Sequence, residues 1–137
     1  MRKLLVITAF LLFAGIAFGQ TLMKGNLIGV HVLTVELKPG ATMDQYIDFF
    51  NEKVIPAWEK TQEGMKIFIM KGIRGEQKNE LGFIVQFKDE ATRDQSYNAD
   101  GTPSEFGEKV QEKIAPIITE MEKIGTWSSK YTDWLVL

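Results

Sequence analysis

Alternating apolar residues predict four strands. Residues 27–37 (LIGVHVLTVEL) and 81–88 (LGFIVQFK) are rich in β-branched and aromatic residues and contain no proline, which is typical of strands. Residues 65–71 (MKIFIMK) have the same character, and residues 126–137 (TWSSKYTDWLVL) alternate well enough for a fourth strand. Only a short link with two glycines, residues 72–80, separates the second stretch from the third. These two strands are therefore expected to form an antiparallel hairpin.

A first helix is predicted to begin at Thr42. Thr42 and Gln45 have the spacing of a capping box, in which each side chain bonds to the backbone of the other residue. Apolar residues then recur at helical spacing, namely Met43, Tyr46, Ile47, Phe50 and Val54. Pro56 lacks a backbone N–H, and its ring clashes with the preceding turn of a helix. We therefore expect a kink or a break before Trp58.

A second helix is predicted from residue 102 onward. Thr102 is expected to be the N-cap, with Pro103 in the first helical position and Glu105 in the third. Gly125 is expected to end the helix. One apolar stripe runs along it, made of Phe106, Val110, Ile114, Ile117, Ile118 and Met121.

The predicted elements follow the order β-α-β-β-α-β. A short polar helix or helical turn and a loop fill residues 89–101, between the third strand and the second helix. Two βαβ-like halves of this kind give an α+β fold of the ferredoxin-like type, a four-stranded antiparallel sheet with two helices on one face. No internal repeat or second domain is visible, so residues 20–137 are expected to form a single domain.

Both faces of the predicted sheet are apolar. His31 shares a face of the first strand with Leu33 and Val35, and this face is expected to meet the helices. The opposite face is also largely apolar, because it carries Ile28, Val30, Val32 and Ile84. Monomers rarely expose an apolar patch of that size, so a homodimer through the sheet face is expected. The alternative is a monomer that tolerates a semi-apolar face.

The first 19 residues have the pattern of a secretory signal peptide. Arg2 and Lys3 precede the uncharged apolar run LLVITAFLLFAGIAF, and Ala17-Phe18-Gly19 supplies small residues at a cleavage site. The apolar run is short for a membrane span. A secreted or periplasmic protein without a stable membrane anchor is therefore expected. An uncleaved N-terminal anchor is the alternative.

The net charge argues against one class of partner, and the cysteine content excludes disulfides. Removal of residues 1–19 leaves 118 residues and changes the formal net charge from −2 to −4. A mildly acidic chain without basic runs argues against nucleic acid as a partner. The chain has no cysteine, so no disulfide can form and the hydrophobic core must hold the fold alone.

His31 is the only histidine and the only candidate catalytic residue. Its ordinary pKa lies near neutrality, which suits a general base. No second catalytic group stands at a recognisable spacing from it. The alternative is therefore a core histidine that is hydrogen-bonded to a neighbouring group.

Aromatic residues on the first helix and the last two strands are candidates for a ligand pocket. Aromatic side chains can form the walls of a pocket for a flat apolar ligand, although they also serve as core or dimer contacts. The candidate ligand-binding residues are His31, Tyr46, Phe50, Phe83, Trp127 and Tyr131.

The sequence predicts neither a metal site nor a cofactor. One histidine and no cysteine are a poor ligand set, and the acidic residues near position 94 lack the spacing of a calcium loop. Glycine-rich nucleotide motifs and the G-x-S-x-G motif of nucleophilic hydrolases are absent from the sequence.

Two stretches resemble the dimeric α/β-barrel superfamily, ferredoxin-like subunits whose sheets pair into a barrel. HVLTVELKPGATMDQYIDFF, at positions 31–50, is similar to the first strand, turn and helix of stress-responsive A/B-barrel domains. It also resembles the antibiotic-biosynthesis-monooxygenase and NIPSNAP-like branches. FIVQFKDEATRDQSY, at positions 83–97, resembles their third strand and following short helix. The resemblance covers residues 27–137.

The resemblance implies different functions for different branches. Monooxygenase-like members oxidise flat aromatic molecules without metal or flavin, in a cavity between sheet and helices. Haem-degrading members use a histidine on a helix, and the only histidine of this chain lies on a predicted strand. Three hypotheses remain: an exported dimer that binds a small molecule in an apolar cavity near His31, a cofactor-independent monooxygenase-like enzyme that uses His31, and a structural or interaction module without a ligand.

Overall fold

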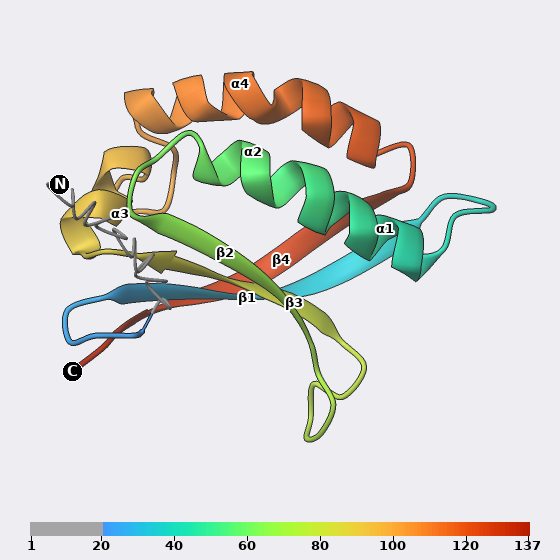
Figure 1. The fold of residues 1–137 in the computed structure, drawn as a ribbon, viewed down its shortest axis with the longest axis horizontal. Helices are drawn as coiled ribbons and strands as arrows, with labels where there is room; N and C mark the ends of the chain where they lie inside the picture. Colours follow the sequence, from blue (N-terminus) through green and yellow to red (C-terminus); the bar gives the residue numbers. More distant parts are fainter. Residues whose placement is uncertain (1–20) are drawn as a thin grey trace, which may run out of the picture.

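Four antiparallel strands form one sheet, and the helices cover one face of it (Figure 1). The computed structural model describes residues 21–137, so the expected signal peptide lies outside the described residues. The elements, in chain order, are β1 (Leu27–Leu37), α1 (Met43–Phe49), the π-helical turn η1 (Phe50–Val54), α2 (Ile55–Glu59), β2 (Met65–Lys71), β3 (Leu81–Phe87), α3 (Glu90–Ser96), α4 (Glu105–Met121) and β4 (Gly125–Leu135).

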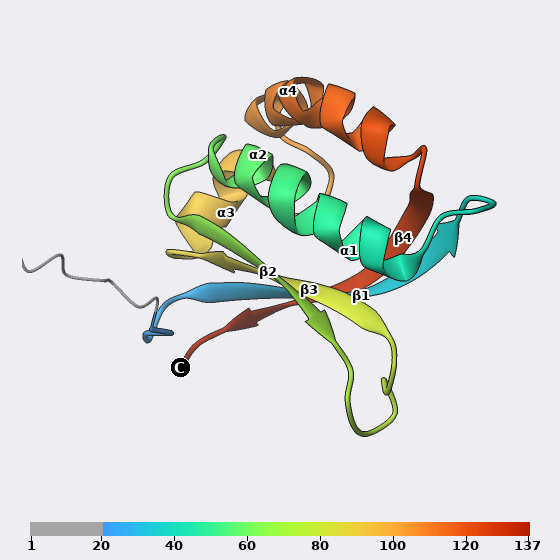
Figure 2. The same cartoon turned by 45° about the vertical axis from the view of Figure 1, so that its right-hand side comes forward.

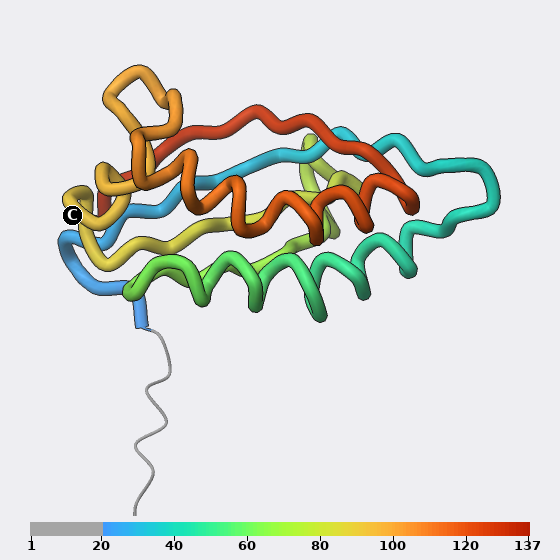
Figure 3. Tube along the Cα trace, turned by 90° about the horizontal axis from the view of Figure 1, so that it is seen from above, coloured from blue at the N-terminus to red at the C-terminus, as the bar shows by residue number. Residues whose placement is uncertain are grey.

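The sheet has the ferredoxin-like strand order. β1 lies inside the sheet, where it pairs with β3 on one side and with β4 on the other, and β2 pairs with β3. Seen from above, the helix formed by α1, η1 and α2 runs beside α4 across the sheet (Figure 3). The predicted fold class and the predicted β2–β3 hairpin are therefore confirmed.

The first helix begins as predicted and passes through Pro56 without a break. The Thr42 hydroxyl accepts a hydrogen bond from the Gln45 backbone, and the Gln45 side chain accepts one from the Thr42 backbone. The wider π-helical turn then precedes α2, with the Ile55 N–H donating to the Phe50 carbonyl. This turn accommodates the proline ring at the start of α2. Of the kink or break expected before Trp58, the break does not occur, and the path stays helical (Figure 2).

The second long helix begins two residues later than predicted. Its N-cap is Ser104, whose hydroxyl accepts a hydrogen bond from the Gly107 N–H at 3.0 Å. Thr102 does not serve as the cap because both its N–H and its hydroxyl donate to the Asp100 carboxylate. The local turn therefore competes with the cap that the sequence suggests.

The sequence predicted that Gly125 ends this helix, and this prediction is wrong. α4 ends at Met121, and Gly125 is the first residue of β4, opposite Leu37. A Cβ atom at Gly125 would lie 3.0 Å from the Glu36 carbonyl oxygen and 3.3 Å from the Tyr46 ring. Close packing of sheet and helix therefore explains this glycine better than a helix stop does.

The core lies between the sheet and the helices. Alternate residues of β3 are buried toward the helices, and they meet apolar residues of α1, η1 and α4. The side chains with the least exposure are Tyr46, Phe50, Phe83, Leu33, Met121 and Val54. The predicted helix-facing sides of β1 and β3 are therefore the sides that pack on the core.

The other face of the sheet exposes large apolar side chains. Phe68 and Met70 of β2 are about two-fifths exposed, and Trp134 of β4 is 61% exposed. Register places Trp134 opposite Ile28 and Phe68 opposite Ile84. Within residues 21–137, no helix combines the length and the apolar character that crossing a membrane requires.

Candidate functional site

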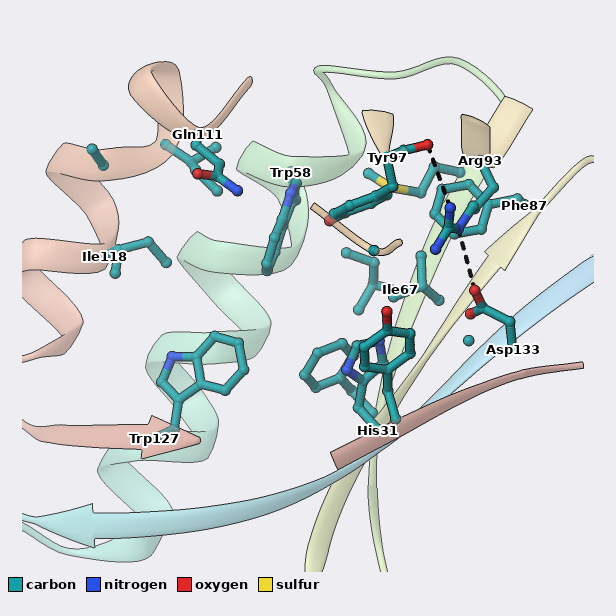
Figure 4. Close-up of a pocket in the computed structure, with 18 of the residues that line it drawn as sticks. His31, Trp58, Ile67, Phe87, Arg93, Tyr97, Gln111, Ile118, Trp127 and Asp133 are labelled. Atoms are coloured by element: carbon teal, nitrogen blue, oxygen red, sulfur yellow. Dashed lines mark hydrogen bonds and ion pairs between the residues drawn. The ribbon is translucent and has the colours of Figure 1, made fainter. Parts of the chain in front are cut away.

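A cavity of about 530 Å³ lies between the sheet and the helices α2 and α4 (Figure 4). Its size falls within the range of small-molecule sites, roughly 300 to 1,000 Å³. The residues that line it are Gly29, His31, Trp58, Met65, Ile67, Phe83, Val85, Phe87, Arg93, Tyr97, Gly101, Gln111, Ile114, Ala115, Ile118, Thr119, Glu122, Trp127, Tyr131 and Asp133.

Most of the cavity wall is apolar and much of it is aromatic. The floor consists of inward-facing residues of the sheet, such as Ile67 and Phe83, and the roof consists of Trp58 from α2 and Ile118 from α4. Trp127 lies at one side of the cavity (Figure 4) and makes a T-shaped contact with Phe83, with 5.9 Å between ring centroids. Such a wall fits a flat apolar ligand.

His31 lies in the cavity between two aromatic rings. Its imidazole stacks on Phe83, with ring centroids 4.2 Å apart, and on Tyr131, with centroids 5.2 Å apart. This stack follows from register, because both residues are cross-strand partners of His31. The Nδ1 atom lies 3.4 Å from the Ser129 hydroxyl oxygen.

Burial lowers the pKa of His31 from its ordinary value of 6.5, and the nearby Asp133 carboxylate opposes the shift. The imidazole is therefore neutral near physiological pH. A neutral imidazole that lines a cavity can accept a proton or a hydrogen bond from a ligand.

The only histidine allows a direct test of this environment by NMR. We expect the His31 ring to titrate below 6.5 in the folded protein, because burial disfavours its charged form. The free energy of unfolding should then fall as the pH drops below the unfolded-chain pKa of about 6.5, since the unfolded chain binds the proton more readily. Asp133→Asn should lower the pKa further, since it removes the charge that favours protonation. A pKa above 6.5 in the wild type would contradict this description.

An ion pair occupies one end of the cavity. The Arg93 Nε atom lies 3.2 Å from Asp133 Oδ2, which joins α3 to β4 (Figure 4). The guanidinium also lies 5.3 Å from the centroid of the Tyr97 ring, a cation–π contact. Burial raises the pKa of Tyr97, against the effect of Arg93, so this phenol is neutral.

Two glycines give the polar end its shape. A Cβ atom at Gly29 would lie 3.1 Å from Asp133 Oδ1 and 3.5 Å from His31 Nε2, so the missing side chain leaves both atoms open to the cavity. Gly101 has a φ of +83°, and a Cβ atom there would collide with the Tyr131 hydroxyl. Glycine therefore allows the loop before α4 to approach Tyr131.

The structure brings four of the six predicted ligand-binding residues together. His31, Phe83, Trp127 and Tyr131 line the cavity. Tyr46 and Phe50 do not, because they are fully buried in the solid part of the core under α1. The Tyr46 hydroxyl is buried there without a hydrogen-bond partner among the described residues.

The sequence interpretation missed the charged end of the cavity. Asp133 shares a face of the last strand with Trp127 and Tyr131, so face counting could have placed it inward. Arg93 and Tyr97 are four residues apart on and just after the short helix α3, which puts them on the same side. No sequence signal joined Arg93 to Asp133. Within residues 21–137, no three His, Cys, Asp or Glu side chains cluster in a way that could hold a metal.

Comparison with known proteins supports the fold and gives no family assignment. No family model and no curated protein matches the chain. A nipsnap-family protein from Agrobacterium tumefaciens is similar in structure, with a TM-score of 0.50 and 12% identity over 82% of this chain and 90% of that one. The resemblance drawn from the sequence is confirmed at the level of the fold. At this identity, the likeness carries no activity across.

Two further structures are similar at lower TM-scores. SnoaB, a cofactor-independent oxygenase from Streptomyces nogalater, has a TM-score of 0.46 and 13% identity over 82% of this chain and 94% of SnoaB. A dimeric protein with a ferredoxin-like fold from Bacteroides fragilis has a TM-score of 0.43 and 10% identity, over 82% of this chain and 97% of that one. At these TM-scores and identities, neither structure carries a function across to this chain.

Proposed function

We propose that this protein binds a small, flat, largely apolar molecule in the cavity beside His31. The observation that carries the proposal is the cavity of about 530 Å³ between the sheet and the helices, beside the packed core. A module that served only a structural role would gain stability by filling such a space. The aromatic and aliphatic wall supports an apolar body for the ligand, and the polar end supports a small number of oriented hydrogen bonds.

A titration with the neutral fluorophore N-phenyl-1-naphthylamine tests this proposal. We expect its emission to rise in an apolar environment and to saturate at one dye per chain. Aromatic residues of the cavity wall such as Trp58 and Trp127 support binding of the aromatic dye there. Emission that never saturates would contradict a defined site.

We further propose that a second copy of the chain covers the exposed apolar face of the sheet. Phe68, Met70 and Trp134 lie on this face or at its edge, well exposed for such large side chains. In a two-fold dimer the same surface of each chain forms the interface, so two such apolar faces can cover each other. The cavity lies on the opposite, helix-covered side of the sheet, so dimerisation would leave it open to ligand.

Export through the N-terminal signal peptide is also a proposal. It rests on the basic start, the apolar run and the small residues before Gln20. N-terminal sequencing of the protein from its native host should give a chain that begins at Gln20. A chain that retains Met1 would contradict the proposal.

Catalysis at His31 is the second candidate function. The observation that favours it is a neutral imidazole inside the cavity, with Nε2 directed toward the open space over Gly29. Such a group could position or deprotonate an aromatic substrate in a cofactor-independent, monooxygenase-like reaction. For any substrate found, His31→Ala should abolish turnover and retain most of the affinity. Unchanged turnover would rule out this role.

A further inference from the structure

Arg93 has a hydrogen-bond donor to spare at the polar end of the cavity. Its Nε atom faces Asp133, and its Nη1 atom donates to the Asn98 carbonyl at 3.0 Å and to the Tyr97 carbonyl at 3.4 Å. Nη1 also lies 3.4 Å from the Asp94 carboxylate. Among residues 21–137, no group accepts a hydrogen bond from Nη2. The side chain is only 11% exposed and lines the cavity, so a ligand is the natural partner for this donor.

Asp133 has an acceptor to spare beside that donor. Its Oδ2 atom faces Arg93, while Oδ1 has no hydrogen-bond donor within the described part of the chain. Oδ1 lies over Gly29, where the missing side chain keeps the carboxylate reachable from the cavity. The ion pair thus presents a donor and an acceptor at the same end of the cavity, held by the contact between α3 and β4.

The Arg93 guanidinium already faces two carboxylates, Asp133 and Asp94. His31 and Tyr97 are uncharged near neutral pH and add no positive charge. An anionic ligand would meet the Asp133 carboxylate with no further cation from the lining residues. A neutral ligand avoids the cost of adding an anion beside these carboxylates.

We infer that the cavity selects a neutral ligand whose flat apolar body carries a hydrogen-bond acceptor next to a donor, as in a carboxamide or a lactam. The acceptor binds Arg93 Nη2 and the donor binds Asp133 Oδ1. This inference rests on the proposed ligand-binding function and adds the chemical class of the polar group.

Three probes of nearly the same shape test the inference by displacement of N-phenyl-1-naphthylamine. They are 2-naphthamide, which offers an acceptor and a donor, 2-acetonaphthone, which offers only the acceptor, and 2-naphthoate, which is an anion. We expect 2-naphthamide to bind about tenfold more tightly than each of the other two, the equivalent of one well-placed hydrogen bond to a charged group.

Two asparagine variants locate the preference. Asp133→Asn should weaken 2-naphthamide binding about tenfold and strengthen 2-naphthoate binding, because the repelling carboxylate next to Arg93 is gone. Asp94→Asn is the matched control, since it removes a carboxylate from the same guanidinium but does not line the cavity. It should leave all three affinities within about twofold of the wild type.

The outcomes separate the inference from the function on which it rests. Equal affinities for the three probes, tightest binding of 2-naphthoate, or the same response in both variants would overturn the inference alone. Dye binding that 2-naphthamide cannot displace would also overturn it while leaving the binding function intact. Absence of saturable dye binding would overturn both.

Discussion

Replacement of Phe50 by alanine is expected to lower the free energy of unfolding by about 3 to 5 kcal/mol. Phe50 is fully buried, and its ring lies 5.7 Å from Phe83 and 6.4 Å from Tyr46 between ring centroids. Its removal would leave a hole in the part of the core where helix and sheet pack without a gap. The cost includes both the lost burial and the unfilled space.

Chemical denaturation followed by circular dichroism measures this loss. Phe106→Ala is the control, because Phe106 lies on α4 and is 39% exposed. We expect that change to cost less than about 1 kcal/mol. An equal loss of unfolding free energy in the two variants would contradict the core position of Phe50. Phe50 would then again be a candidate ligand contact.

Replacement of Phe68 by lysine is expected to convert the proposed dimer into a monomer. Phe68 projects from β2 on the uncovered face of the sheet and is 43% exposed. In a two-fold dimer the change would bury two unpaired ammonium groups at the interface, at a cost of several kcal/mol. The dissociation constant should therefore rise by at least about a hundredfold.

Size-exclusion chromatography with light scattering measures the mass directly. The wild type should have the mass of two chains at micromolar concentration, and Phe68→Lys the mass of one. Phe106→Lys places the same charge on the helix side of the molecule and should remain a dimer. A wild-type mass of one chain would contradict the proposed dimer.

The alternation of residues predicted the strands and their faces well. His31, Leu33 and Phe83 could be placed toward the helices from sequence alone because side chains alternate along a strand. Sequence could not give the register between strands. The stack of His31 between Phe83 and Tyr131 depends on that register, and it emerged only from the structure.

The first helix shows why the cavity could not be placed from sequence. Tyr46 and Phe50 belong to the apolar stripe predicted for this helix, and Trp58 lies beyond the point where a kink or a break was expected. The start of the helix packs directly on the sheet, whereas Trp58 near its end lines the cavity. Periodicity reports which side of a helix faces inward, but the distance between helix and sheet depends on the packing of the whole layer.

Local competition accounts for the errors at the helix ends. The Thr102-Pro103-Ser104 segment offers two possible caps, and the Asp100 carboxylate engages the first of them. The ion pair between Arg93 and Asp133 was missed for a related reason. The two residues are distant in sequence and are brought together only when α3 docks beside the end of β4.

The central claim is that the cavity beside His31 is the ligand site, and a substitution that narrows it tests this claim most directly. Ala115 is a small, exposed residue of α4 that lines the cavity together with Gln111, Ile118 and Glu122. Ala115→Phe should reduce the space for a ligand without changing the exposed face of the sheet. Ala91→Phe, on the exposed surface of α3, adds the same ring away from the cavity.

The decisive measurement is the ratio of the dissociation constants of N-phenyl-1-naphthylamine for Ala115→Phe and for the wild type, with both proteins shown to be folded. We predict a ratio of at least about ten, with Ala91→Phe unchanged from the wild type. A ratio near one for Ala115→Phe would place the dye elsewhere and contradict the assignment of the cavity as the binding site.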